Sequence, residues 1–315
     1  MKVLSEGKRM WTCVMGVFFV YAVIIILFED YDKHFLQPFD EVSDWHLLLF
    51  SIVVMLLLGL LLYHYAHKMD ERISREQMAK QNEMRRQLTQ NIAHELKTPV
   101  ASILGYTDTI IDNPAIAEET KMQFIRRTNA QAQRLTALLQ DISTLNRMDY
   151  APKMLTMERV DISALFADIV EETALAVESK QMKLNNCLPE DVCIQGCWSL
   201  IYSIFRNLVD NAVYYAGEGT TMEISAEEYD NYWTFTFRDN GAGVTEEHLP
   251  HIFERFYRVD KGRSRQMGGT GLGLAIVKNA VLLHGGHINV QNADGGGLQF
   301  DFTLKKNITA CPTGE

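Results

Sequence analysis

The chain has 315 residues, which is long enough for two modest domains that each bury a hydrophobic core. It carries 40 acidic and 30 basic residues, a net charge of -10, and has no long basic run. Binding of nucleic acid requires clustered cations along the phosphate backbone, so this composition argues against that class of function. The 5 cysteines fit a reducing compartment rather than a disulfide framework.

Two uncharged apolar segments near the N-terminus, residues 11–28 and 45–65, predict transmembrane helices. At about 1.5 Å per residue, segments of this length cross the hydrocarbon core of a bilayer. A buried core helix is the alternative interpretation of each segment, but two such segments so close together favour membrane spans. The first span is followed by charged residues rather than a small-residue cleavage site, so we expect it to remain as an anchor.

The residues that flank the two spans predict their orientation. Basic residues precede the first span and follow the second, so both termini are expected in the cytoplasm. The acidic loop between the spans, residues 29–44, is too short for a folded extracytoplasmic ligand domain. A signal must therefore enter through the membrane helices, the loop or a partner membrane protein. The basic flanking residues are Lys2, Lys8, Arg9, Lys68 and Arg72.

Residues 66–150 predict a linker and a helical hairpin. The first helix is expected over residues 66–112, where neither Gly nor Pro occurs before Pro99. A turn follows, and a second helix is expected to end near Asp149. Two helices cannot cover their own apolar stripes, so we expect a second copy of the hairpin to complete a dimeric four-helix bundle. The expected seam of the second helix, with spacings of three and four, is Leu135, Leu138, Ile142 and Leu145.

Residues 151–306 predict a second domain with an α/β sandwich fold. Strand-like and helix-like segments alternate here, as such a fold requires. Residues 307–315 are expected to form a disordered tail. The expected strands are 221–229, 232–240, 287–292 and 298–305, and the expected helices are 200–216 and 271–285.

The stretch "NIAHELKTPV", residues 91–100, places a reactive group on the first helix. If the apolar positions two residues to either side face the bundle core, His94 points to solvent, with Thr98 one turn further on the same face. Glu95 lies beside them, and a carboxylate that accepts a proton from one imidazole nitrogen makes the other a better nucleophile. Pro99 cannot donate to the carbonyl of Glu95, so the helix is expected to bend or loosen here. A solvated surface histidine beside a glutamate is the alternative.

Two motifs of the second domain fit a bound nucleotide. Asn207 and Asn211 lie one turn apart on a helix, where their amide oxygens can reach a hard cation and its phosphates. Asp239 ends a strand, and its carboxylate can accept a hydrogen bond from an exocyclic amine such as that of adenine. Gly241 and Gly243 follow it and let the backbone approach a base closely.

A glycine-rich turn from Gly268 to Gly273 opens the next helix, and its amides and positive helix end suit phosphate. The turn lacks the lysine of a P-loop and does not follow a strand as a dinucleotide fingerprint does. The segment before it predicts a mobile basic lid over a triphosphate, with a solvated loop as the alternative. Its basic residues are Arg255, Arg258, Lys261, Arg263 and Arg265.

In this order and spacing, the motifs resemble those of the sensor histidine kinases of bacterial two-component systems. The resemblance covers about residues 66–306 and rests on "AHELKTP", "NLVDNA", "DNGAGV", "FERFYR" and "GGTGLGLAIVK". It implies an ATP-binding domain of the GHKL type and an ATP-dependent protein-histidine kinase in the cytoplasmic membrane. His94 would accept the γ-phosphoryl group of ATP with help from Glu95. The phosphoryl group would then pass to an aspartate on the receiver domain of a separate response regulator.

The same resemblance implies a set of further roles. Thr98 would orient a water molecule when the kinase dephosphorylates its partner. Asn207 and Asn211 would hold Mg2+ and phosphates, and Asp239 would bind adenine. The remaining residues that the resemblance places around the nucleotide are Tyr215, Gly241, Gly243, Arg258, Gly269, Thr270, Gly271, Leu272 and Gly273.

Two positions depart from the family pattern. Tyr214 stands where a lysine is usual, which puts one phosphate-directed charge in doubt, and Cys197 stands where an aspartate often starts the helix, which makes a poorer cap. Two other functions stay open at this point. A scaffold would bind ATP and transfer nothing, and an ATPase would hydrolyse ATP for conformational work and need no reactive histidine on a hairpin.

Overall fold

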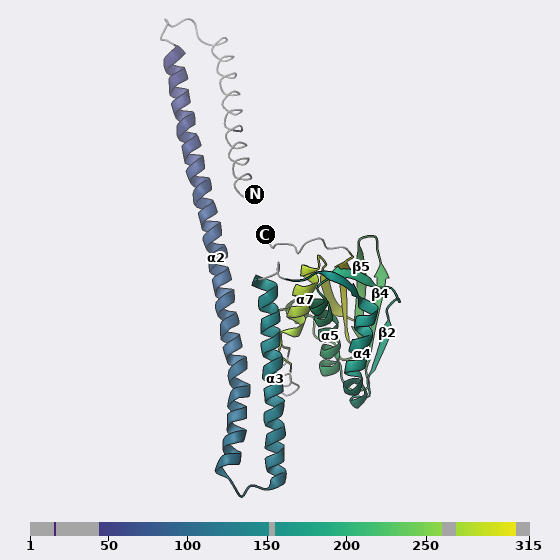
Figure 1. The fold of residues 1–315 in the computed structure, drawn as a ribbon. Coiled ribbons are helices and arrows are strands. Elements are labelled where there is room, and N and C mark those ends of the chain that lie inside the picture. The colour runs from purple at the N-terminus through teal and green to yellow at the C-terminus, as the bar shows by residue number, and fades with distance from the viewer. Residues whose placement is uncertain (1–15, 17–43, 151–154, 260–268, 307–315) are drawn as a thin grey trace. The chain divides into compact units, whose positions relative to one another are not determined.

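The structure is a computed structural model that describes residue 16 and residues 44–150, 155–259 and 269–306 (Figure 1). The chain divides into two compact units, Met1–Gln87 and Leu88–Glu315. The first predicted span, most of the loop after it and the predicted tail lie outside the described residues. The same holds for Gly268 and three predicted basic residues, Lys261, Arg263 and Arg265.

The first unit contains the beginning of a long helix, α2 (Asp44–Asp112). The second predicted span and the predicted first helix of the hairpin are therefore one continuous helix. Within the described residues, one segment is long and apolar enough to cross a membrane, Ser51–Ala79, with a mean hydropathy of 1.6. Large apolar side chains such as Leu56, Leu60 and Leu61 are exposed along it, a surface that favours a lipid environment.

The second unit begins with the helical hairpin, as predicted. The C-terminal part of α2 and helix α3 (Glu118–Tyr150) are joined by a turn in which Ile116 N–H donates to Asn113 O at 3.0 Å. Leu138 and Leu145 of the predicted seam are buried, and the seam continues to Met148. Leu135 and Ile142 are only half-buried in the single chain.

The helix α2 continues through Pro99 to Asp112, so the proline does not end the helix, and the predicted bend stays a prediction. Pro99 is buried, while the side chains around it bond to the backbone. Thr98 Oγ1 donates to His94 O at 3.4 Å, and Ser102 Oγ donates to Thr98 O at 3.0 Å. Hydroxyl groups that bond to the carbonyl four residues earlier slightly destabilise a helix and often bend it.

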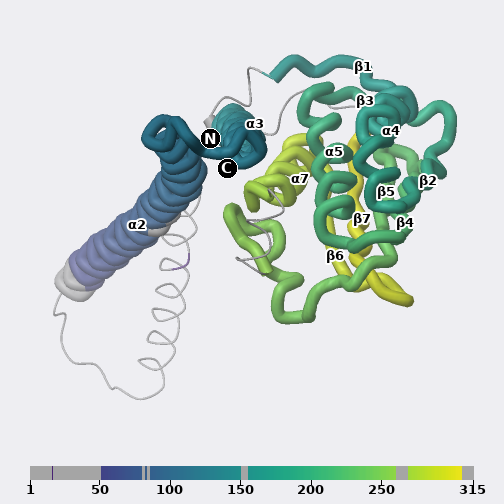
Figure 2. Tube along the Cα trace, turned by 90° about the horizontal axis from the view of Figure 1, so that it is seen from below, coloured from purple at the N-terminus to yellow at the C-terminus, as the bar shows by residue number. Residues whose placement is uncertain are grey.

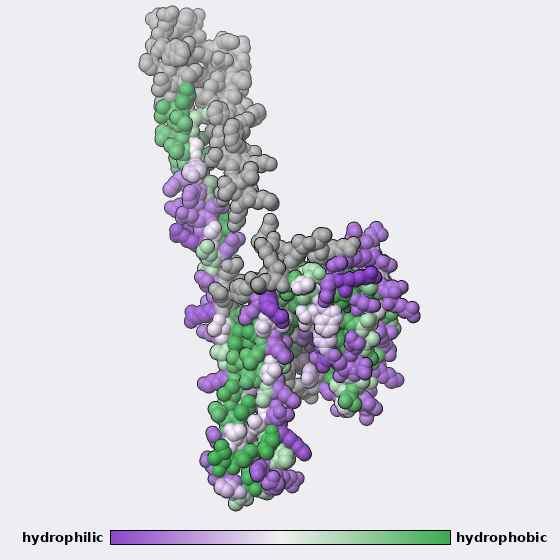
Figure 3. Space-filling model, viewed as in Figure 1, coloured by the Kyte–Doolittle hydropathy of each residue, from purple (hydrophilic) through white to green (hydrophobic). Residues whose placement is uncertain are grey.

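Apolar side chains remain exposed along both helices of the hairpin, where Figure 3 shows a hydrophobic surface on the lower part of the second unit. A single hairpin cannot bury them, which is the situation predicted for one half of a four-helix bundle. The exposed residues are Val100, Leu104, Ile111, Met122, Ile125 and Leu139.

The rest of the second unit is an α/β sandwich, as predicted. Its sheet has 5 strands in the order β2-β4-β5-β7-β6, and β1 pairs with β3 in a small separate sheet. Three helices lie over one face of the large sheet (Figures 1 and 2), namely α4 (Ile162–Ser179), α5 (Trp198–Tyr215) and α7 (Gly273–Leu283). The strands are β1 (Glu158–Asp161), β2 (Lys183–Cys187), β3 (Cys193–Gly196), β4 (Thr221–Glu228), β5 (Tyr232–Asp239), β6 (Ile288–Asn292) and β7 (Leu298–Lys305).

The core between sheet and helices is built on aromatic side chains. Alternate residues of β5 and β7 face the helices, so that Phe235 and Phe302 stack with ring centroids 5.1 Å apart. Phe205 of α5 packs edge-on against Phe235 at 5.4 Å. This packing fixes α5 against the strand that ends in Asp239, and both elements carry predicted site residues.

The start of α5 has an unusual cap. Cys197 makes no side-chain capping hydrogen bond, which agrees with its prediction as a poor cap. Its backbone N–H instead donates to Nε2 of His284 at 3.0 Å, and Nδ1 of the same ring bonds to Ala280 O at 2.7 Å. Because the ring is buried, the pKa of His284 lies below its ordinary value of 6.5.

This cap predicts a pH-dependent part of the stability. The unfolded histidine binds a proton near pH 6.5, whereas the folded one resists it, so the stabilisation is present above that pH and is lost as the pH falls. His284→Leu should destabilise the protein at neutral pH by about 1–3 kcal/mol, because the Cys197 amide loses its acceptor. The difference in the free energy of unfolding between the variant and the wild type should become smaller towards pH 5. Denaturant unfolding of the full-length protein in detergent measures both values, and a gap independent of pH would contradict the prediction.

Candidate nucleotide and phosphoacceptor site

The Asp239 carboxylate lies at the end of β5, where it is 5% exposed. Its Oδ1 accepts from Gly241 N–H at 2.9 Å, and burial raises the pKa of the carboxyl. Gly241 packs so closely on the end of α5 that a Cβ there would lie 2.4 Å from Ala216 O. The glycine therefore serves the packing of the site itself, which the sequence did not indicate.

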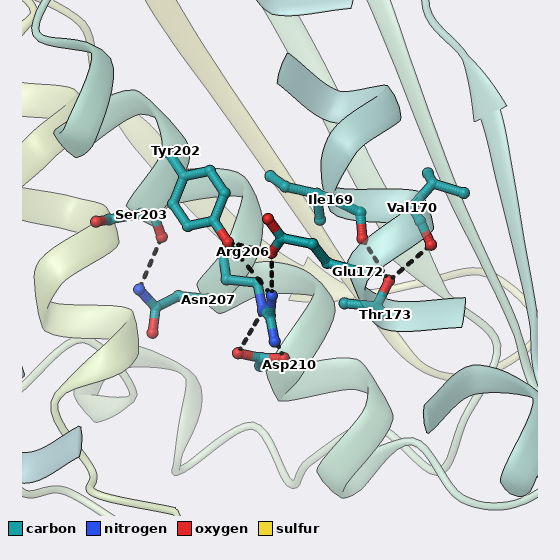
Figure 4. Close-up of polar contacts among 9 residues, drawn as sticks. All are labelled: Ile169, Val170, Glu172, Thr173, Tyr202, Ser203, Arg206, Asn207 and Asp210. Atoms are coloured by element: carbon teal, nitrogen blue, oxygen red, sulfur yellow. Dashed lines mark hydrogen bonds and ion pairs between the residues drawn. The ribbon is translucent and has the colours of Figure 1, made fainter. Parts of the chain in front are cut away.

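Asn207 lies on α5 with its amide oriented by the helix. Its Nδ2 donates to Ser203 O at 2.7 Å (Figure 4), so Oδ1 points away from Ser203. A Cβ on Gly273 would lie 2.5 Å from that oxygen, so Asn207 faces the beginning of α7. Asn211 is half-buried one turn further along α5, and Tyr215 follows after another turn. These three residues line one side of α5, as predicted.

A charged cluster beside Asn207 fixes α5 to α4. Arg206 lies 3.0 Å from Asp210 and 2.7 Å from Glu172 of α4, and Figure 4 shows the guanidinium between the two carboxylates. Burial raises the pKa of Asp210, while the Arg206 charge opposes that shift. This cluster was not predicted, and it holds the asparagine-bearing helix in place.

Tyr214, which occupies the usual lysine position, packs near a cation from another helix. The Lys180 ammonium at the end of α4 lies 5.7 Å from the centroid of the Tyr214 ring. Lys180 Nζ also donates to Val213 O, so its position is fixed by α5. Burial is the main reason that the pKa of Tyr214 is raised. The usual lysine position thus holds the Tyr214 ring, and the Lys180 ammonium lies beside that ring.

The glycine-rich turn before α7 is shaped by a contact with the preceding segment. Phe256 N–H donates to Gly271 O at 2.8 Å, and Phe256 itself has a positive φ of 64°. Gly271 has a φ of +74°, and a Cβ there would lie 3.1 Å from the Cα of Phe256. Strained backbone of this kind persists where the surroundings determine it, and it often occurs at binding sites. Thr270 Oγ1 accepts from Leu272 N–H at 3.2 Å within the turn.

His94 lies on the hairpin, and its side chain is 64% exposed, as predicted. Nδ1 of the ring is 3.8 Å from Oε1 of Glu95, just beyond a hydrogen bond. Glu95 is only 14% exposed, and its Oε2 lies 3.1 Å from Arg258 and 3.6 Å from Arg134. The position of Glu95 beside the histidine is confirmed, but its two cationic partners were not predicted.

Two further contacts join the hairpin to the sandwich near the glycine-rich turn. Thr270 Oγ1 donates to Asp141 Oδ2 at 2.7 Å, and Arg255 bonds to Asp149 at 2.8 Å. Burial raises the pKa of Asp141. The sequence contained a signal for this residue, since Asp141 falls in the same stripe of α3 as the buried Leu138 and Leu145. A charged residue in an apolar stripe indicates a polar partner on the facing element.

The side chains near Asn207 limit how a metal ion could be held. The residues that the structure describes contain no group of three or more His, Cys, Asp or Glu side chains that could hold a metal. A cation at Asn207 and Asn211 would therefore depend on amide oxygens, phosphates and water, and Mg2+ usually keeps several waters and binds substrate phosphates. The tight approach of Gly273 to Asn207 Oδ1 leaves that oxygen beside the helix end that suits phosphate.

Two family matches agree with this arrangement. Residues 84–151 match the His Kinase A (phospho-acceptor) domain, and residues 198–308 match the histidine kinase-, DNA gyrase B- and HSP90-like ATPase domain. The chain belongs to the sensor histidine kinases of bacterial two-component systems. The first match contains His94, and the second contains every predicted nucleotide residue.

Relatives among the sensor kinases agree. The sensor-like histidine kinase SenX3 of Mycolicibacterium smegmatis is 31% identical over 229 residues, which cover 72% of this chain and 59% of SenX3. The phosphate regulon sensor protein PhoR of Haemophilus influenzae is 32% identical over 224 residues, 71% of this chain and 52% of PhoR. The chain thus spans little more than half the length of either relative.

A solved structure shares the fold. The histidine kinase ThkA, in complex with the response regulator protein TrrA, matches with a TM-score of 0.58 and 21% identity. The match covers 70% of this kinase and 61% of the ThkA chain. At this identity the likeness concerns the fold alone.

The contact between Gly271 and Phe256 predicts a sharp loss of nucleotide binding in Gly271→Ala. The added methyl group must displace Phe256, and the alanine backbone must adopt a φ of +74°. A side chain in this conformation costs about 1–3 kcal/mol. Gly219→Ala is a matched control, since Gly219 has a φ of +71° and no atom within 4 Å of its Cβ position. Calorimetric titration with a non-hydrolysable ATP analogue should show weaker binding in the first variant only. Equal losses in both would contradict the role of the Phe256 contact.

Proposed function

We propose that this chain is a membrane-bound kinase that transfers the γ-phosphoryl group of ATP to His94. The phosphoryl group then passes to an aspartate on the receiver domain of a separate response regulator. The observation that carries the proposal is the position of His94, exposed on a hairpin whose acidic residues Glu95 and Asp141 contact the glycine-rich side of the nucleotide domain. A scaffold that only bound ATP would need neither this histidine nor the adjacent carboxylate.

In the proposed reaction, Glu95 Oε1 faces Nδ1 of His94 and holds the proton of that nitrogen. This leaves Nε2 as the attacking atom. A bond forms between Nε2 and the γ-phosphorus while the bond to the bridging oxygen breaks, and ADP leaves with the electron pair. An ATPase would need a positioned water in place of the histidine.

The nucleotide is held from three sides in this proposal. Asp239 accepts from the adenine amine, and Asn207 and Asn211 bind Mg2+, which neutralises charge that develops on the phosphates. The other binding residues come from the end of α5, the segment before the glycine-rich turn and the turn itself. They are Tyr215, Gly241, Gly243, Arg258, Gly269, Thr270, Gly271, Leu272 and Gly273.

The domain arrangement and partners form part of the same proposal. Residues 1–65 anchor the protein in the cytoplasmic membrane by two spans with both termini in the cytoplasm. Residues 66–150 carry the phosphoacceptor hairpin, and 151–306 the ATP-binding domain. The exposed apolar residues of the hairpin support a homodimer, because a second hairpin would bury them. ThkA was solved with a response regulator, which supports a partner of this class here.

His94→Gln tests the proposed phosphoacceptor. The variant should lose all acid-labile phosphate on the protein and still bind ATP, because His94 lies on the hairpin and not in the nucleotide pocket. Labelled ATP measures the first property and calorimetric titration the second. Asp239→Asn should instead weaken ATP binding, since an amide presents a donor where an acceptor is required. Phosphohistidine that persisted in His94→Gln would refute the assignment.

Thr98→Ala tests the proposed phosphatase activity. Thr98 is exposed on the face of His94 and carries no group that nucleophilic attack requires, so it is suited to positioning a water molecule. The variant should keep autophosphorylation and slow the loss of phosphate from the response regulator by about tenfold or more. Decay of the phosphorylated regulator at the same rate with both proteins would count against this role.

A further inference from the structure

The two oxygens of Glu95 have different surroundings. Oε1 faces Nδ1 of His94 at 3.8 Å, whereas Oε2 faces two guanidinium groups, Arg258 at 3.1 Å and Arg134 at 3.6 Å. Both arginine side chains are largely buried, with exposures of 6% for Arg258 and 14% for Arg134. The cations therefore lie on the side of the carboxylate that faces away from the histidine.

The two arginines belong to different elements. Arg134 lies on α3 of the hairpin that carries His94, so its distance to Glu95 is set within the hairpin. Arg258 belongs to the nucleotide domain, where its Nη2 also donates to Gly269 O at 2.6 Å, beside the glycine-rich turn. Phosphates bound at that turn would compete with Glu95 for the Arg258 guanidinium, because both are anions. Arg134 lies on α3 and not in the glycine-rich turn.

We propose that Arg134 is a positioning residue for phosphoryl transfer to His94. Its guanidinium holds Oε2 of Glu95 when Arg258 turns to the nucleotide, and this keeps Oε1 directed at Nδ1 of the histidine. The inference rests on the proposed function, since it requires Glu95 to assist His94. It adds a residue from the second helix of the hairpin that acts only through Glu95.

A carboxylate on a helix can rotate about its side-chain bonds, and this gives the proposal its physical basis. Without a partner on Oε2, Glu95 would sample several rotamers and spend less time with Oε1 near the imidazole. A partly buried ion pair between side chains of 14% exposure restricts that motion. Small displacements of a catalytic group reduce rates strongly, because reaction requires the aligned geometry.

A double-mutant cycle on the full-length protein in lipid vesicles tests the inference. Arg134→Gln should lower the rate of autophosphorylation at saturating ATP by roughly tenfold and leave the affinity for ATP unchanged. In a Glu95→Gln background, adding Arg134→Gln should lower the rate no further, because the two residues act as one unit. An equal further loss in that background would overturn the proposal, since Arg134 would then act independently of Glu95.

Two more variants separate positioning from folding. Arg134→Lys keeps a cation on α3 and should restore part of the lost rate. Arg126→Gln removes an exposed arginine from the same helix and should leave the rate at the wild-type level. The proposal would be overturned if autophosphorylation were as slow in Arg126→Gln as in Arg134→Gln. It would also be overturned if Arg134→Lys were as slow as Arg134→Gln, because either result would show a general effect on the hairpin.

The tautomer of His94 gives a readout that a purely structural role would not move. If Arg134 directs Glu95 at Nδ1, nitrogen NMR of His94 in Arg134→Gln should show a smaller share of the Nδ1–H tautomer than in wild type. An unchanged tautomer distribution would refute the positioning role. Failure of the proposed function is separate, because it would appear as wild-type phosphorylation in Glu95→Gln or His94→Gln alone.

Discussion

The ion pair between Glu95 and Arg258 is the interaction on which the rest of the site depends, because it joins the helix that carries His94 to the nucleotide domain. Two further contacts support it, from Asp141 to Thr270 and from Asp149 to Arg255. In each case the hairpin supplies an acid, and the domain supplies a donor close to the glycine-rich turn. In the proposed function, two of these donors, Arg258 and Thr270, also bind the phosphates of the nucleotide. Docking of the hairpin and binding of the triphosphate therefore draw on the same groups.

The backbone of the nucleotide domain is shaped to present these donors. Phe256 holds a positive φ and bonds to Gly271, which holds one as well. The positive φ is unfavourable for Phe256 but not for a glycine, and Phe256 also packs against the hydrophobic core. Phe205 and Phe235 anchor that core between α5 and the sheet. The strained residue Phe256 thus lies between this core and the glycine-rich turn.

Local sequence patterns were sufficient to predict the hairpin, most strands of the large sheet and the exposed position of His94. These features depend on neighbouring residues, whose periodicity determines which face is buried. The partners of Glu95 and the cap of α5 could not be predicted in the same way. Arg258 is 163 positions from Glu95, and His284 is 87 positions from the Cys197 amide. Such pairs are set by the tertiary fold, and a single sequence contains no local signal for them. Asp141 is an intermediate case, since its place in an apolar stripe indicated a partner without identifying it.

The proposed mechanism places two opposing requirements on the carboxylate of Glu95, and the contacts around it satisfy both. It must be held firmly enough to orient the imidazole, yet its contacts must not block the oxygen that faces His94. Placing both guanidinium groups on Oε2 meets both requirements, because the cations fix the side chain from behind and leave Oε1 towards Nδ1. The separation of 3.8 Å between Oε1 and Nδ1 is then a short distance to close, and a small rotation of either side chain completes the hydrogen bond. A cation in the hairpin and a second one in the nucleotide domain also make the orientation of Glu95 dependent on the position of the domain. In the proposed mechanism, the reactivity of His94 is in this way coupled to the position of the nucleotide domain.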